Sequence, residues 1–468
     1  MLLVRSIASG FQVVFFMAAV VLLSGTGESL ANGTNFQYQE IHSFSNAQVG
    51  DPRGKLWESA DGYFYGVSGY QSSTDPSTVY RIRKDGSGYE VLHHFPDDVT
   101  CNAIMEASDG KLYGGEFMYL RNRPHTLFRM NKNGSDFVVL HSFPTNGSDG
   151  LGIVARLTEG PDRMLYGASA GNGLLLGGAV FRVGRDGNNF QILRQFGSNP
   201  ANGIGPAGPL LVSADGFIYG VTSDRPTDDS NRGTVFRLST NGTDFLTLKT
   251  FGNTRADGWW PQGGLVEDTD GTLYGATSSG GYRQAGVIFQ MHKNGANYTA
   301  IHEFQGDEET GDDPFGNLVI GSDGFIYGAT QDGGRLGAGT IYRVRKNGEG
   351  FEILRIYIDL AETHTGTPGG PLTRSSNGAL YGVANAGGEF GRGSIFRFAQ
   401  ESKLSIGRRN GEATITWPGL PEGYELQETT ELGLSWKASA TNQTNQLGTA
   451  EATLPLIGPS RFFRLFPR

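Results

Sequence analysis

Aromatic rings and arginines in the variable stretches of this chain are the residues whose types suggest recognition chemistry. Exposed aromatic rings stack on sugar rings and other apolar ligand faces, and a planar guanidinium grips a carboxylate or a sulfate through paired hydrogen bonds. Together these residue types predict a binding surface whose ligand is an acidic polysaccharide or a surface protein. The predicted ligand-binding residues are Trp259, Trp260, Tyr70, Tyr119, Tyr282, Arg121, Arg123, Arg232, Arg283, Arg335 and Arg392.

A structural interpretation of the same residues stays open beside this one. Trp259 and Trp260, which stand just before Pro261, would then plug a gap between two repeats of the chain. The arginines would be ordinary surface charge.

Four histidines raise the question of a metal site. His42, His93, His141 and His302 occupy one position of a repeated pattern, where other copies carry Arg194, Lys249 or Arg355. A position that accepts all three residue types is expected to be a solvated position on an outer strand, and ligands of one ion must lie within a few ångström of each other. The sequence therefore predicts no metal and no cofactor.

The single cysteine and the acidic clusters are the other candidates for chemistry. Cys101 has no partner for an intramolecular disulfide, and a nucleophilic thiolate would need a nearby base, so a buried or edge thiol is expected. Acidic clusters occur at 307–309, at Asp312-Asp313 and around Glu267 to Asp270, without the spaced pattern of a calcium loop. They are the only general acid or base candidates, and no catalytic residue is predicted.

The spacing of all these residues is set by a motif that recurs seven times. Each copy centres on Tyr-Gly, and six copies place Asp-Gly or Asn-Gly just before it. The seven tyrosines are Tyr65, Tyr113, Tyr166, Tyr219, Tyr274, Tyr327 and Tyr381. A period of about 53 residues is typical of propeller blades.

Within a repeat, short apolar runs separated by turn residues predict four strands. Asp-Gly and Asn-Gly pairs, such as Asp61-Gly62 and Asp85-Gly86, favour tight hairpins in which both residues take positive φ, and two such hairpins make a four-stranded antiparallel blade. The hairpin turns are alike in nearly every copy, whereas the other connections are long and differ. One face is therefore expected to be uniform and the other variable, and binding is expected on the variable face.

The seventh repeat stops after Phe398, and residues 32–44 carry the pattern of its missing fourth strand. We therefore expect an all-β chain whose seven-bladed propeller, residues 32–400, is closed by the N-terminal strand, since closure removes an unpaired edge. Residues 401–468 lose the repeat and predict a small β-sandwich. Residues 1–31, with Arg5 and an apolar run from Val13 to Leu23, predict a secretory signal peptide, because the run is shorter than the roughly 20 residues of a spanning helix.

The charge of the chain indicates which classes of partner are unsuitable. The formal net charge is −9 and no basic block occurs, which argues against a nucleic-acid partner. With the leader removed, no stable membrane span is expected, and the protein is predicted in the periplasm, outside the cell or at its surface.

The Asp-Gly-x-Leu-Tyr-Gly and Gly-Thr-Val-Phe-Arg motifs resemble the GloVer tandem repeat of exported bacterial proteins, over roughly residues 36 to 398. The tail, with Trp417, Tyr424 to Gln427, Trp436 and Phe462 to Leu465, is similar to a fibronectin type III-like module. The resemblance implies export and a propeller-like repeat domain, and it brings no catalytic residues. The tail lacks the hydrophobic helix and basic cluster of a sorting signal, so non-covalent retention or release is expected.

Three functions follow from these observations. The first is an exported, non-enzymatic binding or interaction protein of the cell envelope. The second is an envelope polysaccharide lyase or hydrolase that uses the variable face of the propeller, and the third is a purely structural surface protein.

Overall fold

The computed structural model describes most of the chain between residues 36 and 400 and parts of both ends. Described are residues 2–7, 10–14, 36–45, 47–69, 76–96, 99–117, 124–145, 150, 152–171, 177–197, 202–223, 232–254, 256–307, 310–334, 337–357, 367–400 and the strands between 405 and 467. These residues contain strands and turns, and no α-helix. None of the described segments is a helix long and apolar enough to span a membrane.

Seven four-stranded antiparallel sheets form a seven-bladed propeller. Blade 1 has β4 (Pro52–Glu58), β5 (Tyr63–Ser68), β6 (Thr78–Arg83) and β7 (Glu90–His94); blade 2 has β8 (Thr100–Glu106), β9 (Leu112–Phe117), β10 (His125–Met130) and β11 (Val138–Phe143). Blade 3 has β12 (Thr158–Glu159), β13 (Leu165–Ser169), β14 (Ala179–Val183) and β15 (Gln191–Gln195); blade 4 has β16 (Pro206–Val212), β17 (Phe217–Thr222), β18 (Thr234–Ser239) and β19 (Phe245–Thr250).

The remaining three blades repeat the pattern, with a short ribbon added beside blade 5. Blade 5 has β21 (Val266–Glu267), β22 (Leu273–Thr277), β24 (Val287–Met291) and β25 (Thr299–Glu303), and blade 6 has β26 (Asp312–Ile320), β27 (Phe325–Asp332), β28 (Thr340–Arg345) and β29 (Glu352–Ile356). Blade 7 has β30 (Thr373–Arg374), β31 (Leu380–Ala384) and β32 (Ser394–Gln400), with β3 (Phe36–Ser43) hydrogen-bonded to β32 as the outer strand. A short ribbon of β20 (Gly258–Trp259) and β23 (Ser279–Gly280) stands beside blade 5.

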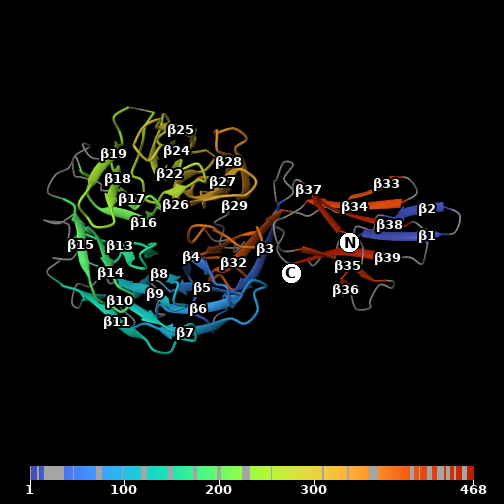
Figure 1. The fold of residues 1–468 in the computed structure, drawn as a ribbon, viewed down its shortest axis with the longest axis horizontal. Coiled ribbons are helices and arrows are strands. Elements are labelled where there is room, and N and C mark those ends of the chain that lie inside the picture. Colours follow the sequence, from blue (N-terminus) through green and yellow to red (C-terminus); the bar gives the residue numbers. More distant parts are fainter. Residues whose placement is uncertain are drawn as a thin grey trace.

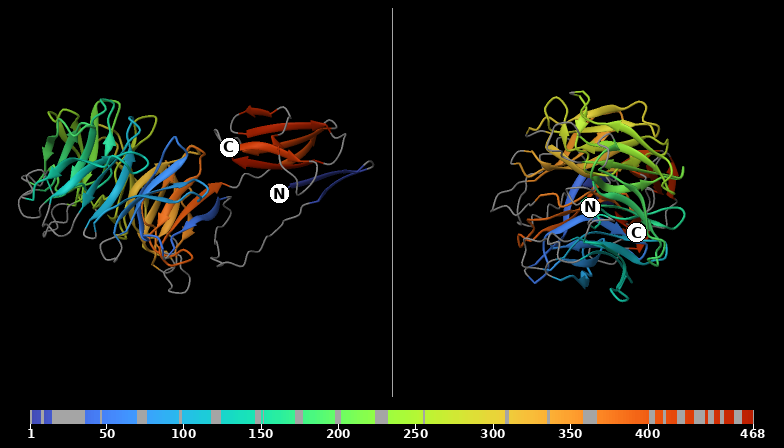
Figure 2. Two further views of the ribbon diagram at one scale, coloured as in Figure 1. Left: turned by 90° about the horizontal axis from the view of Figure 1, so that it is seen from below. Right: turned by 90° about the vertical axis from the view of Figure 1, so that its left-hand side faces the viewer.

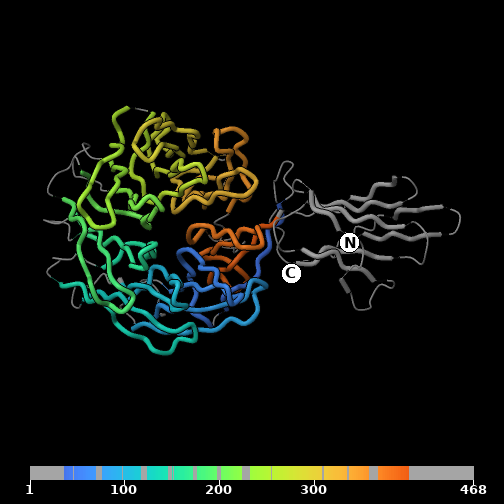
Figure 3. Tube along the Cα trace, viewed as in Figure 1, coloured from blue at the N-terminus to red at the C-terminus, as the bar shows by residue number. Residues whose placement is uncertain are grey.

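Figure 1 shows the blades following one another around a ring, with first strands such as β4, β8, β16 and β26 on the inner side and β7, β11, β15 and β19 on the outer side. The trace in Figure 3 runs once around the ring, so that blade 7 lies beside blade 1. The two further views in Figure 2 show the strands crossing the thickness of the ring.

The hairpin turns confirm the predicted positions and correct the predicted geometry. Within each Asp-Gly or Asn-Gly pair only the glycine takes positive φ, as at Gly62 with φ 87°. The first hairpin of blade 1 is closed by the hydrogen bonds from Ser59 N to Tyr63 O (3.0 Å) and from Gly62 N to Ser59 O (3.1 Å). Asp61 Oδ1 accepts the backbone N–H of Tyr63 at 3.1 Å, which holds the aspartate in an ordinary conformation. In blade 3 the glycine position is held by Arg163 at φ 63°.

The glycine of each Tyr-Gly motif faces an aromatic ring on the neighbouring strand. The seven register pairs are Gly66–Tyr80, Gly114–Phe128, Gly167–Phe181, Gly220–Phe236, Gly275–Phe289, Gly328–Tyr342 and Gly382–Phe396. A Cβ on Gly275 would lie 2.5 Å from Phe289 Cζ and 2.9 Å from Leu265 Cδ2. The absent side chain therefore makes the space in which the ring of the third strand packs.

The tyrosine of the motif ties the blade to its turn. Tyr65 Oη donates to Asp61 Oδ2 at 2.8 Å, and the same bond recurs in blades 2, 3, 4 and 6. Lys132, from the second hairpin of blade 2, binds Glu106 of its own blade and lies 3.4 Å from Asp61 of blade 1. Lys293 makes the same bridge between Glu267 of blade 5 and Asp215 of blade 4. These ion pairs join neighbouring blades at the hairpin turns.

The ends of the chain form two further sheets. One contains β33 (Ser405–Arg409), β34 (Glu412–Pro418), β38 (Thr449–Pro455) and β37 (Gln443–Gln446). The other contains β2 (Gly10–Val14), β1 (Leu2–Ile7), β39 (Arg461–Pro467), β35 (Tyr424–Thr429) and β36 (Lys437–Ala438). Residues 15–35, which include most of the predicted apolar run, lie outside the described residues.

The glycine–aromatic pair gives a direct stability prediction. Gly275→Ala places a methyl group against Phe289, and we expect the free energy of unfolding to fall by about 1–3 kcal/mol through overpacking. The double variant Gly275→Ala with Phe289→Leu should destabilise by less than the sum of the two single changes, because the smaller side chain makes room. Chemical denaturation measures all four proteins of this cycle, and additive effects would contradict the packing argument.

Candidate functional site

The propeller has a turn face, where the hairpin turns lie, and a loop face, where strand two joins strand three and each blade joins the next. The loop face carries connections of unequal length, and parts of them lie outside the described residues. The connections best described on this face belong to blades 4, 5 and 7.

Five predicted binding residues lie in connections of blades 4 and 5, and we call them the blade 4–5 platform. They are Arg232, Trp259, Trp260, Tyr282 and Arg283. Trp259 is part of β20, which pairs with β23 through Gly258–Gly280 and Trp259–Ser279. The register places Trp260 opposite Ser278 and Asp257 opposite Gly281, so Trp259 and Trp260 lie at one end of the ribbon, and Tyr282 and Arg283 follow its other end.

Arg232 stacks on Trp259. The guanidinium carbon lies 3.7 Å from the centroid of the indole, and the backbone O of Arg232 accepts the N–H of Trp260 at 2.8 Å. Trp259 is half-buried and also packs against the core of blades 4 and 5, which contains Val235 and Phe251. The indole thus helps to fill the gap between the blades, and it also orients a guanidinium at the loop face.

Tyr282 and Arg283 stand at the exposed end of the ribbon. Tyr282 is 59% exposed, and it is one of the few large hydrophobic side chains exposed in the described part of the chain. The backbone N–H of Arg283 donates to Glu303 Oε1 at 3.0 Å, which fixes the loop while the side chain stays exposed. Lys249 and Asp257 form an ion pair at 2.9 Å beneath the ribbon.

Of the other six predicted binding residues, the structure describes Arg392. Tyr70, Tyr119, Arg121, Arg123 and Arg335 lie outside the described residues. Arg392 lies on the β31–β32 connection of blade 7, where its backbone O accepts the N–H of Asp51 at 2.8 Å. It therefore belongs to the contact between blade 7 and the β3–β4 connection.

Two carboxylates meet on the loop face of blade 6. Asp312 at the start of β26 is the register partner of Asp332 at the end of β27. Burial, and then the negative charge of Asp312, raise the pKa of Asp332. Sequence inspection pointed to Asp312 and Asp313 and missed Asp332, because the register shift between Phe315 and Val319 hides this pairing from residue counting.

The predicted solvated position of the four histidines is wrong. His42, His93, His141 and His302 are half-buried and stack on aromatic rings of the next blade. His141 lies 3.6 Å from the ring of Phe190 with an interplanar angle of 6°. Arg194, Lys249 and Arg355 occupy the same position in other blades and lie over Phe245, Tyr298 and Tyr38. Histidine, arginine and lysine all suit this position, because each can pack a flat or cationic group on an aromatic ring of the next blade.

The remaining candidates for chemistry are structural in the described chain. Cys101 is buried, and burial raises the pKa of its thiol to about 12, so it is not a thiolate at neutral pH. Glu267 and Asp268 are bound by Lys293 and Lys346. Among the described residues no group of three His, Cys, Asp or Glu side chains could hold a metal ion.

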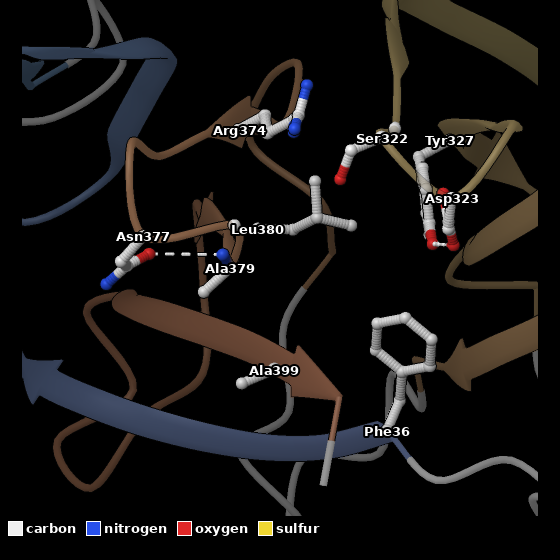
Figure 4. Close-up of a pocket in the computed structure, with 11 residues that line it drawn as sticks. Phe36, Ser322, Asp323, Tyr327, Arg374, Asn377, Ala379, Leu380 and Ala399 are labelled. Atoms are coloured by element: carbon white, nitrogen blue, oxygen red, sulfur yellow. Dashed lines mark hydrogen bonds between the residues drawn. The ribbon is translucent and has the colours of Figure 1, made fainter. Parts of the chain in front are cut away.

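A shallow depression lies at the turn-face seam of blades 6 and 7. Figure 4 shows the ring of Phe36 pointing toward Asp323 and Tyr327, with Arg374 on the opposite side. Its volume is about 60 Å³, enough for a few waters and too small for a sugar ring. Asp323 already accepts the hydroxyl of Tyr327 at 2.6 Å, so this depression is a weaker candidate than the platform.

Comparisons with known proteins agree with the repeat and the fold. The family model for the Gloeobacter/Verrucomicrobia repeat matches residues 51–263 and 208–410. An oligogalacturonate lyase in complex with manganese has a TM-score of 0.53 and 10% identity, over 79% of this chain and 94% of that chain. A puromycin-hydrolysing peptidase of Mycobacterium tuberculosis has a TM-score of 0.50 and 13% identity, over 81% of this chain and 61% of that chain. No curated protein matches the sequence. At these identities the structural matches show the fold alone.

The histidine stacks predict a pH dependence of stability. Burial lowers the pKa of His302 from 6.5 to about 4. Between these values the unfolded chain binds a proton that the folded chain does not, so stability falls as pH decreases through this window.

We expect His302→Phe to keep the stack on Phe351 and to flatten this pH dependence. Denaturant unfolding at pH 7 and pH 4.5 measures the difference for both proteins. An equal loss of stability in the variant would show that His302 does not titrate in this way.

Proposed function

The chain belongs to the Gloeobacter/Verrucomicrobia repeat family, and we propose that it is an exported binding protein of the cell envelope or extracellular space, without enzymatic activity. The observation that carries the proposal is the guanidinium of Arg232 stacked on Trp259 at one end of the β20–β23 ribbon, with the exposed Tyr282 and Arg283 at its other end. An anionic polysaccharide fits this chemistry, because arginine forks bind carboxylate or sulfate while aromatic rings stack on sugar faces. A surface protein with an acidic patch fits the same guanidinium groups.

Export rests on the leader pattern of residues 1–31, and the proposed mature protein begins near Asn32. Removal of the leader takes β1 and β2 from the sheet of β39 and leaves β39 paired with β35. We assign the two sheets of residues 405–467 to a fibronectin type III-like sandwich that attaches or spaces the propeller.

An envelope polysaccharide lyase or hydrolase is the second candidate. The adjacent Asp312 and Asp332 favour it, because a carboxyl group with a raised pKa beside a second carboxylate is the arrangement that general acid and base catalysis uses. One of the fold neighbours is an oligogalacturonate lyase, and its similarity to this chain is one of fold.

The platform is tested by retention on immobilised polygalacturonate and on neutral dextran. We expect the wild-type protein to be retained on the acidic glycan, and Tyr282→Ala or Arg283→Met to weaken retention about 5- to 10-fold, which corresponds to about 1–1.4 kcal/mol each. Leu246→Ala is a matched control for Tyr282→Ala, because Leu246 is an exposed apolar side chain on the outer strand β19. Trp259→Ala should reduce retention and also stability, since the indole packs against the core.

The same samples separate the three functions. Unsaturated or reducing-end products that disappear in Asp332→Asn would support the enzyme and overturn the binding proposal. Equal retention of wild type, Tyr282→Ala and Arg283→Met would show that the blade 4–5 platform is not the binding site. The absence of both retention and product would favour a purely structural protein.

We also infer that the N-terminal strand closes the ring. The guanidinium carbon of Arg355 lies 3.6 Å from the centroid of the Tyr38 ring in β3. His42 of β3 stacks on Tyr89, with the two ring centroids 5.0 Å apart. These contacts give β3 the same neighbours as the fourth strands of the other blades.

Deletion of residues 32 to 46 is expected to abolish cooperative unfolding, because β32 would lose its partner and two inter-blade stacks would be lost. The double variant Tyr38→Ala with His42→Ala should keep cooperativity and lower the unfolding midpoint. A melting profile of the deletion variant identical to that of the full chain would refute the closure.

A further inference from the structure

The first strands of the blades are interrupted where they approach the centre of the ring. In β4 the register shifts between Arg53 and Trp57, and equivalent shifts occur in β8, β16 and β26. Each interruption ends on a buried aliphatic residue, such as Leu56 or Leu210. We call the residues just before this aliphatic side chain the neck ring. They are Lys55, Ala103, Arg156, Pro209, Gly264, Asn317 and Pro371.

Neighbouring blades pack closely at the neck ring. Gly264 N donates to Asn317 Oδ1 at 2.7 Å, and a Cβ on Gly264 would clash with the backbone O of Pro209. A Cβ on Gly54 would lie 2.7 Å from the backbone O of Asn102, and one on Gly370 would clash with the backbone O of Gly54. The inner strands of neighbouring blades therefore approach each other through backbone atoms.

Two of the seven neck positions carry a positive charge and none carries a carboxylate. The charges are Lys55 in blade 1 and Arg156 in blade 3, separated by the small Ala103 of blade 2. Arg156 reaches back to blade 1, where its guanidinium carbon lies 4.9 Å from the centroid of the Trp57 indole. Stacking occupies one face of a guanidinium and leaves its N–H edge free to bind an oxygen ligand.

Neither cation has a carboxylate partner among the residues that the structure describes, in contrast to the lysines on the turn face. Lys132 and Lys293 each contact two carboxylates, which raise the pKa of the ammonium group against the effect of burial. Burial, and then the positive charge of Arg156, lower the pKa of Lys55 to about 8, and burial lowers the pKa of Arg156 to about 10. Two partly buried cations that repel each other in a chain of net charge −9 need an explanation.

We propose that the neck ring binds one small oxyanion, a carboxylate or a sulfate group, between Lys55 and Arg156. The anion neutralises the repulsion and accepts hydrogen bonds from the ammonium and the guanidinium edge. Two cations suit a free anion or a single terminal acidic group. The site is separate from the blade 4–5 platform and does not depend on the proposed glycan binding.

The test compares sodium acetate and sodium sulfate with sodium chloride at equal ionic strength, by isothermal titration calorimetry and thermal unfolding of the full chain at pH 7. We expect acetate, sulfate or both to bind the wild type and raise its Tm above the chloride value. Acetate alone identifies a carboxylate site and sulfate alone a sulfate site. Lys55→Met and Arg156→Met should each weaken binding at least 10-fold.

A second measurement separates loss of binding from loss of fold. In chloride, Lys55→Met should have a higher Tm than the wild type, because it removes one of two repelling charges. Arg345→Met is the matched control, since Arg345 is an exposed cation on the turn face, and it should bind the anion as the wild type does. Anion binding by the wild type should also weaken as pH rises above 8, because Lys55 then loses its proton. Arg156, whose positive charge repels the Lys55 ammonium, stays protonated in this range.

Equal stabilisation of the wild type, Lys55→Met and Arg156→Met by sulfate would reveal a general salt effect and overturn the proposal. A lower Tm of Lys55→Met in chloride would also overturn it, because the ammonium would then have a stabilising partner. No heat of binding and no rise in Tm with either salt would have the same consequence.

Discussion

The structure depends on one packing constraint, the contact between a glycine on the second strand and an aromatic ring on the third. The pair recurs in register in all seven blades, and the ring fills the space that a Cβ would need. It places the tyrosine before the glycine so that its hydroxyl reaches the turn aspartate, and it directs the aromatic side chain into the core between blades. A single local rule thus produces the repeated blade.

Polar contacts join neighbouring blades at the turn face, and aromatic contacts join them at the outer strands. On the turn face, lysines such as Lys132 bridge carboxylates of neighbouring blades, and at the outer strands a histidine, arginine or lysine covers an aromatic ring of the next blade. Each blade can make these contacts only with neighbours on both sides, so the frame is stable as a whole ring. On the loop face the connections differ in length and in sequence from blade to blade.

The repeat allowed much of the frame to be predicted and little of the candidate sites. The Tyr-Gly motif and the Asp-Gly pairs predicted the strands and hairpins, because these signals are local. The stacking of His141 on Phe190 was missed, because its partner lies one full repeat away and a shared position says nothing about what it touches. Arg232 and Trp259 were both among the eleven predicted binding residues. Their stacking, and the juxtaposition of Lys55 with Arg156, appear only when the ring brings separate blades together.

The central claim is that function lies where unlike side chains interrupt a sevenfold frame. Hydrogen–deuterium exchange of the full chain with and without an acidic oligosaccharide, such as oligogalacturonate, tests it most directly. The account predicts slower exchange confined to the connections around residues 256–262 and 278–286, with the hairpin turns unchanged. Protection spread evenly over all seven blades, or centred on the hairpin turns, would contradict it.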